Sequence, residues 1–263
     1  KQNGDPMSAQ PRPPAAPSTT FSGERIAVVN PRTGVVDHHV TAPSRVEVQQ
    51  LAQQMRLAQR AWRDAGLAHR IEVLQRWRAG LVAAQAEIIA ALTVDTGRHL
   101  IAISEFQAIP AYIDRWTKLV PQLPPDQADA PMQTASANPA IVFRPQYVPY
   151  ALVGVISPWN FPLTLTLIDA IPALLAGSAV LIKPSEVTPL TAHRMSTLCK
   201  AAGIPAGVLN IVHGLGPKVG AAITAHPRIP ALSFTGGTRT GAEIARVAAP
   251  MFKKLSLELG GKN

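Results

Sequence analysis

Leu152-Val153-Gly154-Val155-Ile156-Ser157 is the first of five apolar, strand-like runs that lie between Leu152 and Leu259, and this stretch decides the fold. The other runs are Ala179–Ile182, Val208–Val212, Ala231–Phe234 and Leu255–Leu257. Helix-like segments separate the runs, over about 163–176, 188–202, 218–225 and 240–249. Short apolar strands that alternate with helices are typical of a parallel sheet, because each crossover returns the chain to the starting edge. We therefore predict an α/β fold whose parallel five-stranded sheet has flanking helices.

Each run is followed at once by residues that suit ligand binding. The segments that follow the runs are Pro158-Trp159-Asn160, Lys183-Pro184-Ser185-Glu186, His213-Gly214-Leu215-Gly216, Thr235-Gly236-Gly237-Thr238 and Glu258-Leu259-Gly260-Gly261. The carboxyl ends of parallel strands line one edge of a sheet, and ligands bind in the crevice there. The sequence therefore predicts one site at this edge.

Two glycine-rich loops stand between a strand and a helix. The first runs from Gly214 through Gly216 and Pro217 to Gly220, and its glycine spacing is one residue longer than the standard dinucleotide fingerprint. The second runs from Gly236 through Gly237 and Thr238 to Gly241. Glycines let a backbone approach a ligand, and the helix that follows favours an anion at its amino end. Either loop is also explained as a tight strand–helix turn.

Charged and amide side chains on the same edge have two readings each. Lys183 and Glu186 suit contacts to ribose hydroxyls, or they lie in an exposed helix-entry loop. Asn160 suits stabilisation of an oxyanion, or it caps the helix that follows. Glu258 ends an apolar run, where burial would raise its pKa and favour a general base; the alternative is a paired core carboxylate.

Composition sets limits on the function. The chain has 263 residues, is 47% hydrophobic and carries a net charge of +9, with its arginines spread along helices. We expect no nucleic-acid partner, because no basic run is interleaved with aromatics. We also expect no membrane span, no signal peptide and no metal site. The single cysteine, Cys199, lies on an apolar helix face, where we expect a buried, inert thiol; it fits a reducing, cytoplasmic location.

The rest of the chain divides into three parts before the sheet. Residues 1–20 are proline-rich and predict a disordered tail. Residues 21–121 predict two strands, at 26–29 and 35–40, and then helices over about 44–62, 68–96 and 104–120, the first opened by a Ser44–Glu47 capping box. Residues 122–150 predict a linker and an extended arm with strand character over 140–149, and residues 151–263 form the predicted sheet domain.

Taken together, these segments resemble the NAD(P)-dependent aldehyde dehydrogenase superfamily over about Ile26 to Asn263. The resemblance rests on Asn30-Pro31 with Thr33-Gly34, Asp95-Thr96-Gly97, Ser157-Pro-Trp-Asn-Phe-Pro162, Lys183-Pro-Ser-Glu186, Pro205 with Gly207 and Asn210, Phe234-Thr-Gly236 and Leu257-Glu-Leu-Gly-Gly-Lys262. It implies a Rossmann-like NAD-binding core with N-terminal helical and strand elements. It also implies an oligomerisation arm over 122–150 and assembly as a homodimer or homotetramer.

The resemblance also implies roles for single residues. Asn160 would donate to the oxyanion of a thiohemiacetal, and Glu258 would activate the water that hydrolyses the thioacyl enzyme. The implied contacts of the cofactor, NAD with NADP as the alternative, are Lys183 and Glu186 at the adenosine ribose, Gly216 and Pro217 near the adenine, Gly236, Gly237, Thr238 and Gly241 near the pyrophosphate, and Trp159 along the cleft. The substrate would be an aldehyde.

The sequence departs from the family pattern in two ways. Gly237 stands where a serine is common, which removes one hydroxyl contact. The family's nucleophilic cysteine belongs some tens of residues after the Leu-Glu-Leu-Gly-Gly motif, beyond Asn263, and Cys199 matches no catalytic position. We therefore expect the 263 residues by themselves to bind a dinucleotide without oxidising aldehydes; the alternative to an enzyme is a non-catalytic dinucleotide-binding fragment.

Overall fold

A computed structural model describes residues 23–123, 132–144 and 147–261. Its centre is a parallel sheet of five strands in the order β7-β6-β5-β8-β9. The strands are β5 (Leu152–Ile156), β6 (Ala179–Lys183), β7 (Leu209–Ile211), β8 (Ala231–Gly236) and β9 (Lys254–Leu259). The predicted α/β fold with a five-stranded parallel sheet is confirmed. Because β5 is joined to β6 on one side and β8 on the other, the strand order reverses beside β5, which is where ligands bind in such sheets.

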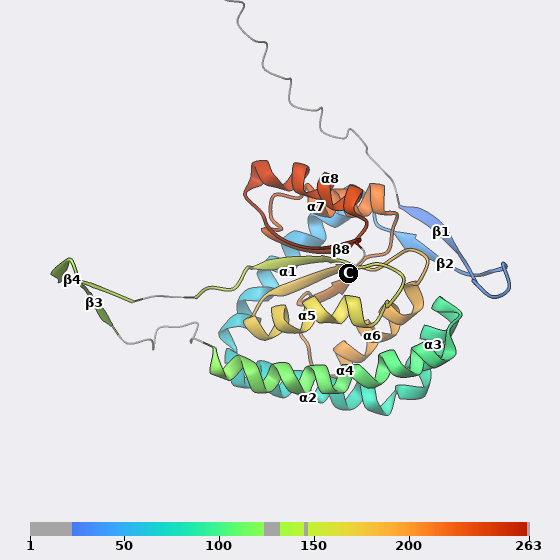
Figure 1. Cartoon of the computed structure of the whole chain (residues 1–263), viewed down its shortest axis with the longest axis horizontal. Coiled ribbons are helices and arrows are strands. Elements are labelled where there is room, and N and C mark those ends of the chain that lie inside the picture. The colour runs from blue at the N-terminus through green and yellow to red at the C-terminus, as the bar shows by residue number, and fades with distance from the viewer. Residues whose placement is uncertain (1–22, 124–131, 145–146, 262–263) are drawn as a thin grey trace, which may run out of the picture.

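Helices cover both faces of the sheet (Figure 1). One face carries α5 (Thr164–Ala176) and α6 (Pro189–Ala201), and the other carries α7 (Ala221–Thr224) and α8 (Thr238–Ala248). Neighbouring residues of β6 serve opposite cores: Val180 and Ile182 pack with α5 and α6, whereas Leu181 packs on the other side. A strand that is buried on both faces needs apolar residues at every position, so the runs in the sequence are continuous rather than alternating.

The N-terminal region completes both layers. Strands β1 (Glu24–Val29) and β2 (Val36–Ala42) form an antiparallel hairpin. Helix α1 (Arg45–Asp64) packs on the α7 and α8 side of the sheet. Its predicted capping box is present, since the Glu47 N–H donates to Ser44 Oγ at 3.2 Å and the Ser44 N–H donates to the Glu47 carboxylate at 2.6 Å.

The helix expected over 68–96 is wrong as a single element. The structure has α2 (Gly66–Ala83) and α3 (Gln85–Thr96), which are bent by 73° about Ala84. Ala84 leaves the helical conformation with φ −94° and ψ 17°, and its side chain packs against the core. No glycine or proline marks the bend, so tertiary packing decides it. Helix α4 (His99–Leu119), followed by a short 3₁₀ turn η1 (Val120–Gln122), begins five residues before the expected start at 104.

The arm is a hairpin of β3 (Gln133–Ala135) and β4 (Asn138–Phe143) that projects away from the sheet domain (Figure 1). The linker expected up to residue 139 is therefore shorter than predicted, because residues from 133 onward already pair as strands. The expected tail over 1–20, and the parts of the linker at 124–131 and 145–146, lie outside the described residues. Helix α7 differs as well, because a π-helical turn η2 (Gly216–Gly220) precedes it.

No single helix in the described residues is long and apolar enough to cross a membrane. The bent pair α2 and α3 meets that criterion together, by length and composition only. Both helices contribute buried side chains to the core beside α5 and α6, among them Trp77 and Leu92.

Candidate functional site

The carboxyl edge of the sheet brings the predicted site segments together. Lys183 pairs in register with Ile156 at the end of β5, and Phe234 of β8 pairs with the same residue from the other side. Glu258 of β9 is in register with Thr235 of β8. The segments that follow β5, β6 and β8 therefore leave the sheet at one edge, with Glu258 beside them.

Lys183 and Glu186 form an ion pair at this edge, in which the lysine is buried and the carboxylate is partly exposed. The ammonium nitrogen of Lys183 lies 3.0 Å from a carboxylate oxygen of Glu186 and also donates to the carbonyl oxygen of Pro184 at 2.8 Å. The Lys183 side chain is 3% exposed and that of Glu186 is 29% exposed. Burial lowers the pKa of Lys183, and the Glu186 carboxylate opposes that shift. The exposed-loop alternative is therefore wrong for Lys183, and the acceptor that faces outward is Glu186.

The glycines of the two loops serve different purposes. A Cβ atom on Gly216 or Gly237 would meet nothing within 4 Å, so the backbone there is open to a ligand. A Cβ on Gly236 would lie 2.5 Å from Phe234, and one on Gly241 would lie 2.4 Å from Leu259. A side chain at either of these positions would therefore displace Phe234 or Leu259, so packing as well as ligand access explains these two glycines.

The first turn of α8 leaves its backbone donors available. Gly237 is the N-cap residue, and no side chain caps the helix. Thr238 instead turns its hydroxyl to the carbonyl oxygen of Gly260, at 3.3 Å. Unsatisfied N–H groups at a helix amino end, next to a backbone without a Cβ, are suited to a phosphate. The residues present therefore fit the pyrophosphate of a dinucleotide.

Asn160 does not cap the helix that follows it. The N-cap position of α5 is Leu163, and no side chain at that position makes a capping bond. A carboxyl oxygen of Glu105, on α4, accepts instead from the backbone N–H groups of Leu163 at 2.9 Å and Thr164 at 2.8 Å. The capping alternative for Asn160 is thus wrong. Its side chain is exposed and forms no hydrogen bond with any residue that the structure describes.

Arg98 fixes the loop from the other side. Its guanidinium donates to the backbone carbonyl oxygen of Asn160 and lies over the ring of Phe161, 5.4 Å from the ring centroid. Sequence reasoning missed both Arg98 and Glu105, because they lie more than fifty residues before Asn160. The available signal was Glu105 itself, a carboxyl group between Ala102 and Phe106 on the buried face of a helix. Burial raises the pKa of this carboxyl group.

Glu258 is exposed, so the expectation of a buried carboxylate is wrong for the described residues. The physical reason is that β9 is the outermost strand of the sheet and that its buried alternation belongs to Leu255 and Leu257. A second carboxyl group is nearby on α5. Burial raises the pKa of Asp169, a hydrogen bond with Ser233 opposes this, and the charge of Glu258 raises it further. Asp169 was not identified from the sequence.

The structure also gives the positions of Trp159, Pro217 and Cys199. Trp159 is 59% exposed beside the loop of Asn160. Pro217 lies in the π-helical turn that starts at Gly216, and the next residue, Lys218, forms an ion pair with Glu24 at 2.6 Å. Cys199 is 2% exposed on α6, and burial raises the pKa of its thiol well above the usual value.

Comparison with known proteins agrees with this geometry. The reversal of strand order beside β5 is that of a Rossmann-like sheet, the class of fold that holds dinucleotides at such a point. Residues 19–263 match the model of the aldehyde dehydrogenase family, and the chain belongs to this family.

Several relatives illustrate the match. The chain is 39% identical over 245 residues to 2-hydroxymuconic semialdehyde dehydrogenase of Pseudomonas sp. (strain CF600), covering 92% of the chain and 50% of the relative. It is 36% identical to 2-aminomuconic semialdehyde dehydrogenase of Bos taurus, covering 89% and 47%. The chain thus spans about half the length of the curated relatives it matches.

Solved structures show the same fold. PutA of Anabaena variabilis superposes with a TM-score of 0.84 at 40% identity, covering 91% of this chain and 50% of that chain. Aldehyde dehydrogenase C of Pseudomonas syringae, solved with NAD+ and octanal, gives a TM-score of 0.82 at 31% identity, covering 94% and 49%.

Proposed function

We propose that the protein oxidises an aldehyde to a carboxylic acid with NAD(P)+ and that the carboxyl edge of this sheet holds the dinucleotide. The observation that carries the proposal is the convergence of three features at one edge. They are the ion pair between buried Lys183 and partly exposed Glu186, the open backbone at Gly237 before an uncapped helix, and the exposed amide of Asn160. Family membership supports the same reaction class.

The residues divide the dinucleotide between them in this proposal. Glu186 accepts hydrogen bonds from the adenosine ribose hydroxyls, and Lys183 holds the Glu186 carboxylate in place by donating to it. Gly216 and Pro217 lie against the adenine, the turn from Gly236 to Gly241 takes the pyrophosphate, and Trp159 lines the cleft. When bound, the nicotinamide supplies the hydride acceptor of the oxidation.

Asn160 and Glu258 act on the substrate in the proposed reaction. When a thiolate adds to the aldehyde carbonyl, the oxygen becomes an oxyanion, and the Asn160 amide donates to it. After the oxidation, Glu258 takes a proton from the water that hydrolyses the resulting thioester. Cys199 does not provide the thiolate, because its sulfur is buried in the core between α6 and the sheet.

The cofactor we propose is NAD+ rather than NADP+. A 2′-phosphate would place a second negative charge against the Glu186 carboxylate and displace the ribose hydroxyl that it binds. Lys183 offsets this only in part, because its ammonium group already bonds Glu186 and Pro184. Calorimetric titration of the purified protein with both oxidised dinucleotides tests the preference. Equal or tighter binding of NADP+ would refute it. Glu186→Gln is expected to reduce the difference in affinity between NAD+ and NADP+.

Turnover separates the enzyme from a module that only binds the dinucleotide. We expect residues 1–263 alone to bind NAD+ without forming NADH from aldehydes, because the one thiol is buried. Steady NADH production by those residues that survives Cys199→Ala would contradict the proposed mechanism. Dinucleotide binding without aldehyde oxidation by the whole protein would favour the binding module instead.

We also propose that copies of the protein assemble as a homodimer or homotetramer through the β3–β4 hairpin, and that it works in the cytoplasm. Every residue of β4 is exposed, including Ile141, Val142 and Phe143, which are each at least 45% exposed. Such a surface is suited to burial against another chain. Sedimentation of wild type and of Val142→Asp tests the assembly; a variant that remains as large as wild type would exclude the hairpin as the interface.

A further inference from the structure

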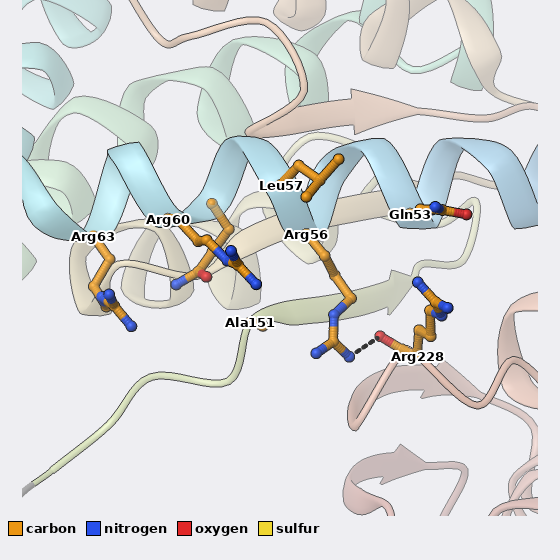
Figure 2. Close-up of a pocket in the computed structure, with 8 residues that line it drawn as sticks. Gln53, Arg56, Leu57, Arg60, Arg63, Ala151 and Arg228 are labelled. Carbon is orange, nitrogen blue, oxygen red and sulfur yellow. Dashed lines mark hydrogen bonds between the residues drawn. The ribbon is translucent and has the colours of Figure 1, made fainter.

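Figure 2 shows a hollow that is lined by arginines from α1 and by Arg228. Its volume is about 400 Å³. Ala151, which directly precedes β5, lies at its base, and Arg228, just before β8, lies across from α1. Because β5 and β8 are paired neighbours, this hollow stands at the amino ends of both strands.

The arginines of the hollow come from two elements. Arg56, Arg60 and Arg63 follow each other at intervals of four and three residues on α1, so they share one helix face. Arg228 faces them, and Arg56 donates to its backbone carbonyl oxygen at 3.3 Å. The hollow is completed by neutral side chains, namely Gln53, Leu57, Gln59 and Ala151.

Few carboxylates balance these charges. The lining contains no Asp or Glu. Among the described residues, Arg63 has an ion pair with Asp64 at 2.7 Å, with both side chains more than 40% exposed. No such ion pair is formed by Arg56, Arg60 or Arg228 within the described ranges. Like charges placed together raise the free energy of the fold unless an anion joins them.

The arginines of the hollow also act on a neighbouring histidine. Burial lowers the pKa of His226, and the positive charges of Lys253, Arg228 and Arg56 lower it further. Burial also lowers the pKa of Lys253 to about 8. The causes of these two shifts include no carboxylate, in keeping with the absence of Asp and Glu from the lining of the hollow.

We propose that this hollow is a binding site for a small oxyanion that carries two or more negative charges, such as a diphosphate. Guanidinium groups bind such oxygens in bidentate geometry, and several of them around one concavity favour a multivalent anion over a single carboxylate. The volume falls within the range of small-molecule sites and exceeds the needs of a lone ion. The site is separate from the proposed dinucleotide edge, because it adjoins the other ends of the same strands.

The test uses inorganic pyrophosphate and isothermal titration calorimetry of the purified protein, in the presence of saturating NAD+. Wild type is expected to bind one pyrophosphate per chain, and the double variant R56Q/R60Q to bind about tenfold more weakly or worse. The matched control is R115Q/K118Q, which removes two exposed cations from α4 and is expected to bind as wild type does. R228Q tests the opposite wall without removing the Arg56 hydrogen bond, which uses the backbone of Arg228.

The outcomes distinguish a defined binding site from a diffuse effect of surface charge. Loss of binding in both R56Q/R60Q and R228Q, with circular dichroism spectra and melting curves like those of wild type, supports the proposal. Binding that persists in those variants, or that falls equally in R115Q/K118Q, shows a diffuse charge effect and overturns it. Absence of pyrophosphate binding by wild type at about 0.15 M salt, where surface charges more than about 8 Å apart are screened, also overturns it.

Discussion

Glu105→Ala is expected to destabilise the protein strongly, although residue 105 lies on a helix remote from the sheet edge in sequence. The carboxyl oxygen accepts two backbone hydrogen bonds, from the N–H groups of Leu163 and Thr164. Each buried donor left without an acceptor costs about 1–3 kcal/mol. Two such donors, one buried and one partly buried, give a loss of about 2–5 kcal/mol in the free energy of unfolding. Glu105→Gln retains a carbonyl oxygen, so it is expected to lose only about 1 kcal/mol.

Urea denaturation followed by far-ultraviolet circular dichroism measures these differences. Glu72→Ala is the matched control, because Glu72 lies on the exposed face of α2 and pairs with the exposed Arg76. An exposed pair contributes about 0–1 kcal/mol, so this variant is expected to stay close to wild type. If Glu105→Ala is no less stable than Glu72→Ala, the two hydrogen bonds do not hold the amino end of α5, and the argument about the Asn160 loop fails with them.

Three further predictions concern acid stability and catalysis. Burial lowers the pKa of His213 from 6.5 to about 4, and the charges of His193, Lys183 and His38 contribute to this shift. As the pH falls, the unfolded chain therefore binds the proton before the folded chain does, and the free energy of unfolding declines from about pH 6.5 down to about pH 4. At pH 5 the loss in the free energy of unfolding is about 2 kcal/mol, and His213→Gln is expected to remove this part of the pH dependence measured by urea unfolding. If the variant keeps the pH dependence of wild type, protonation of His213 is not its cause. Glu258→Gln in the active protein is expected to give a burst of NADH and then a rate lower by about 10²–10⁴-fold; wild-type steady turnover would remove its role as base. Asn160→Ala is expected to slow the burst itself, by about 2.7–4 kcal/mol in activation free energy, and a normal burst would exclude the oxyanion contact.

Strands β5 and β6 were predictable because both of their faces are buried. Each of them is a continuous apolar run, so both were recognised almost to the residue. The spatial order of the strands was not predictable, because it depends on which face each crossover covers. The exposure of Glu258 follows from that order, since the residues of a central strand are covered on both faces, whereas β9 is outermost.

Features of the fold that depend on tertiary contacts were not predictable from the sequence. The bend at Ala84 has no local signal, and only the packing of α2 and α3 against the core explains it. In the candidate site, local pairings were predictable from the sequence and long-range ones were not. Lys183 and Glu186 are three residues apart on one loop, so their pairing was within reach of the sequence. Glu105 and Arg98 contact the Asn160 loop across 58 and 62 residues, and such pairings become visible only in the folded chain.

Helices α5 and α6, which lie on one face of the sheet, are capped by carboxyl groups of the outer helices α4 and α3. The N-cap position of α5 is Leu163, which is fully buried, so a polar capping residue there would remove an apolar side chain from the core. Glu105 of α4 supplies the acceptor instead. Asp95 does the same for α6, accepting from the backbone N–H and hydroxyl of Thr191 at 2.8 and 2.7 Å.

This arrangement gives a physical reason for a motif that carries no reacting group. Asp95 belongs to Asp95-Thr96-Gly97, where α3 ends in the left-handed conformation at Gly97, with φ 71°. A carboxyl group that is buried raises the free energy of the fold unless it is hydrogen-bonded, and both buried carboxyl groups meet this condition only while α5 and α6 stand in register with the outer helices. Because α5 follows Asn160 and α6 follows Glu186, the outer layer sets the position of both loops that face the proposed cofactor. Substitutions there are therefore expected to change dinucleotide affinity without touching the dinucleotide.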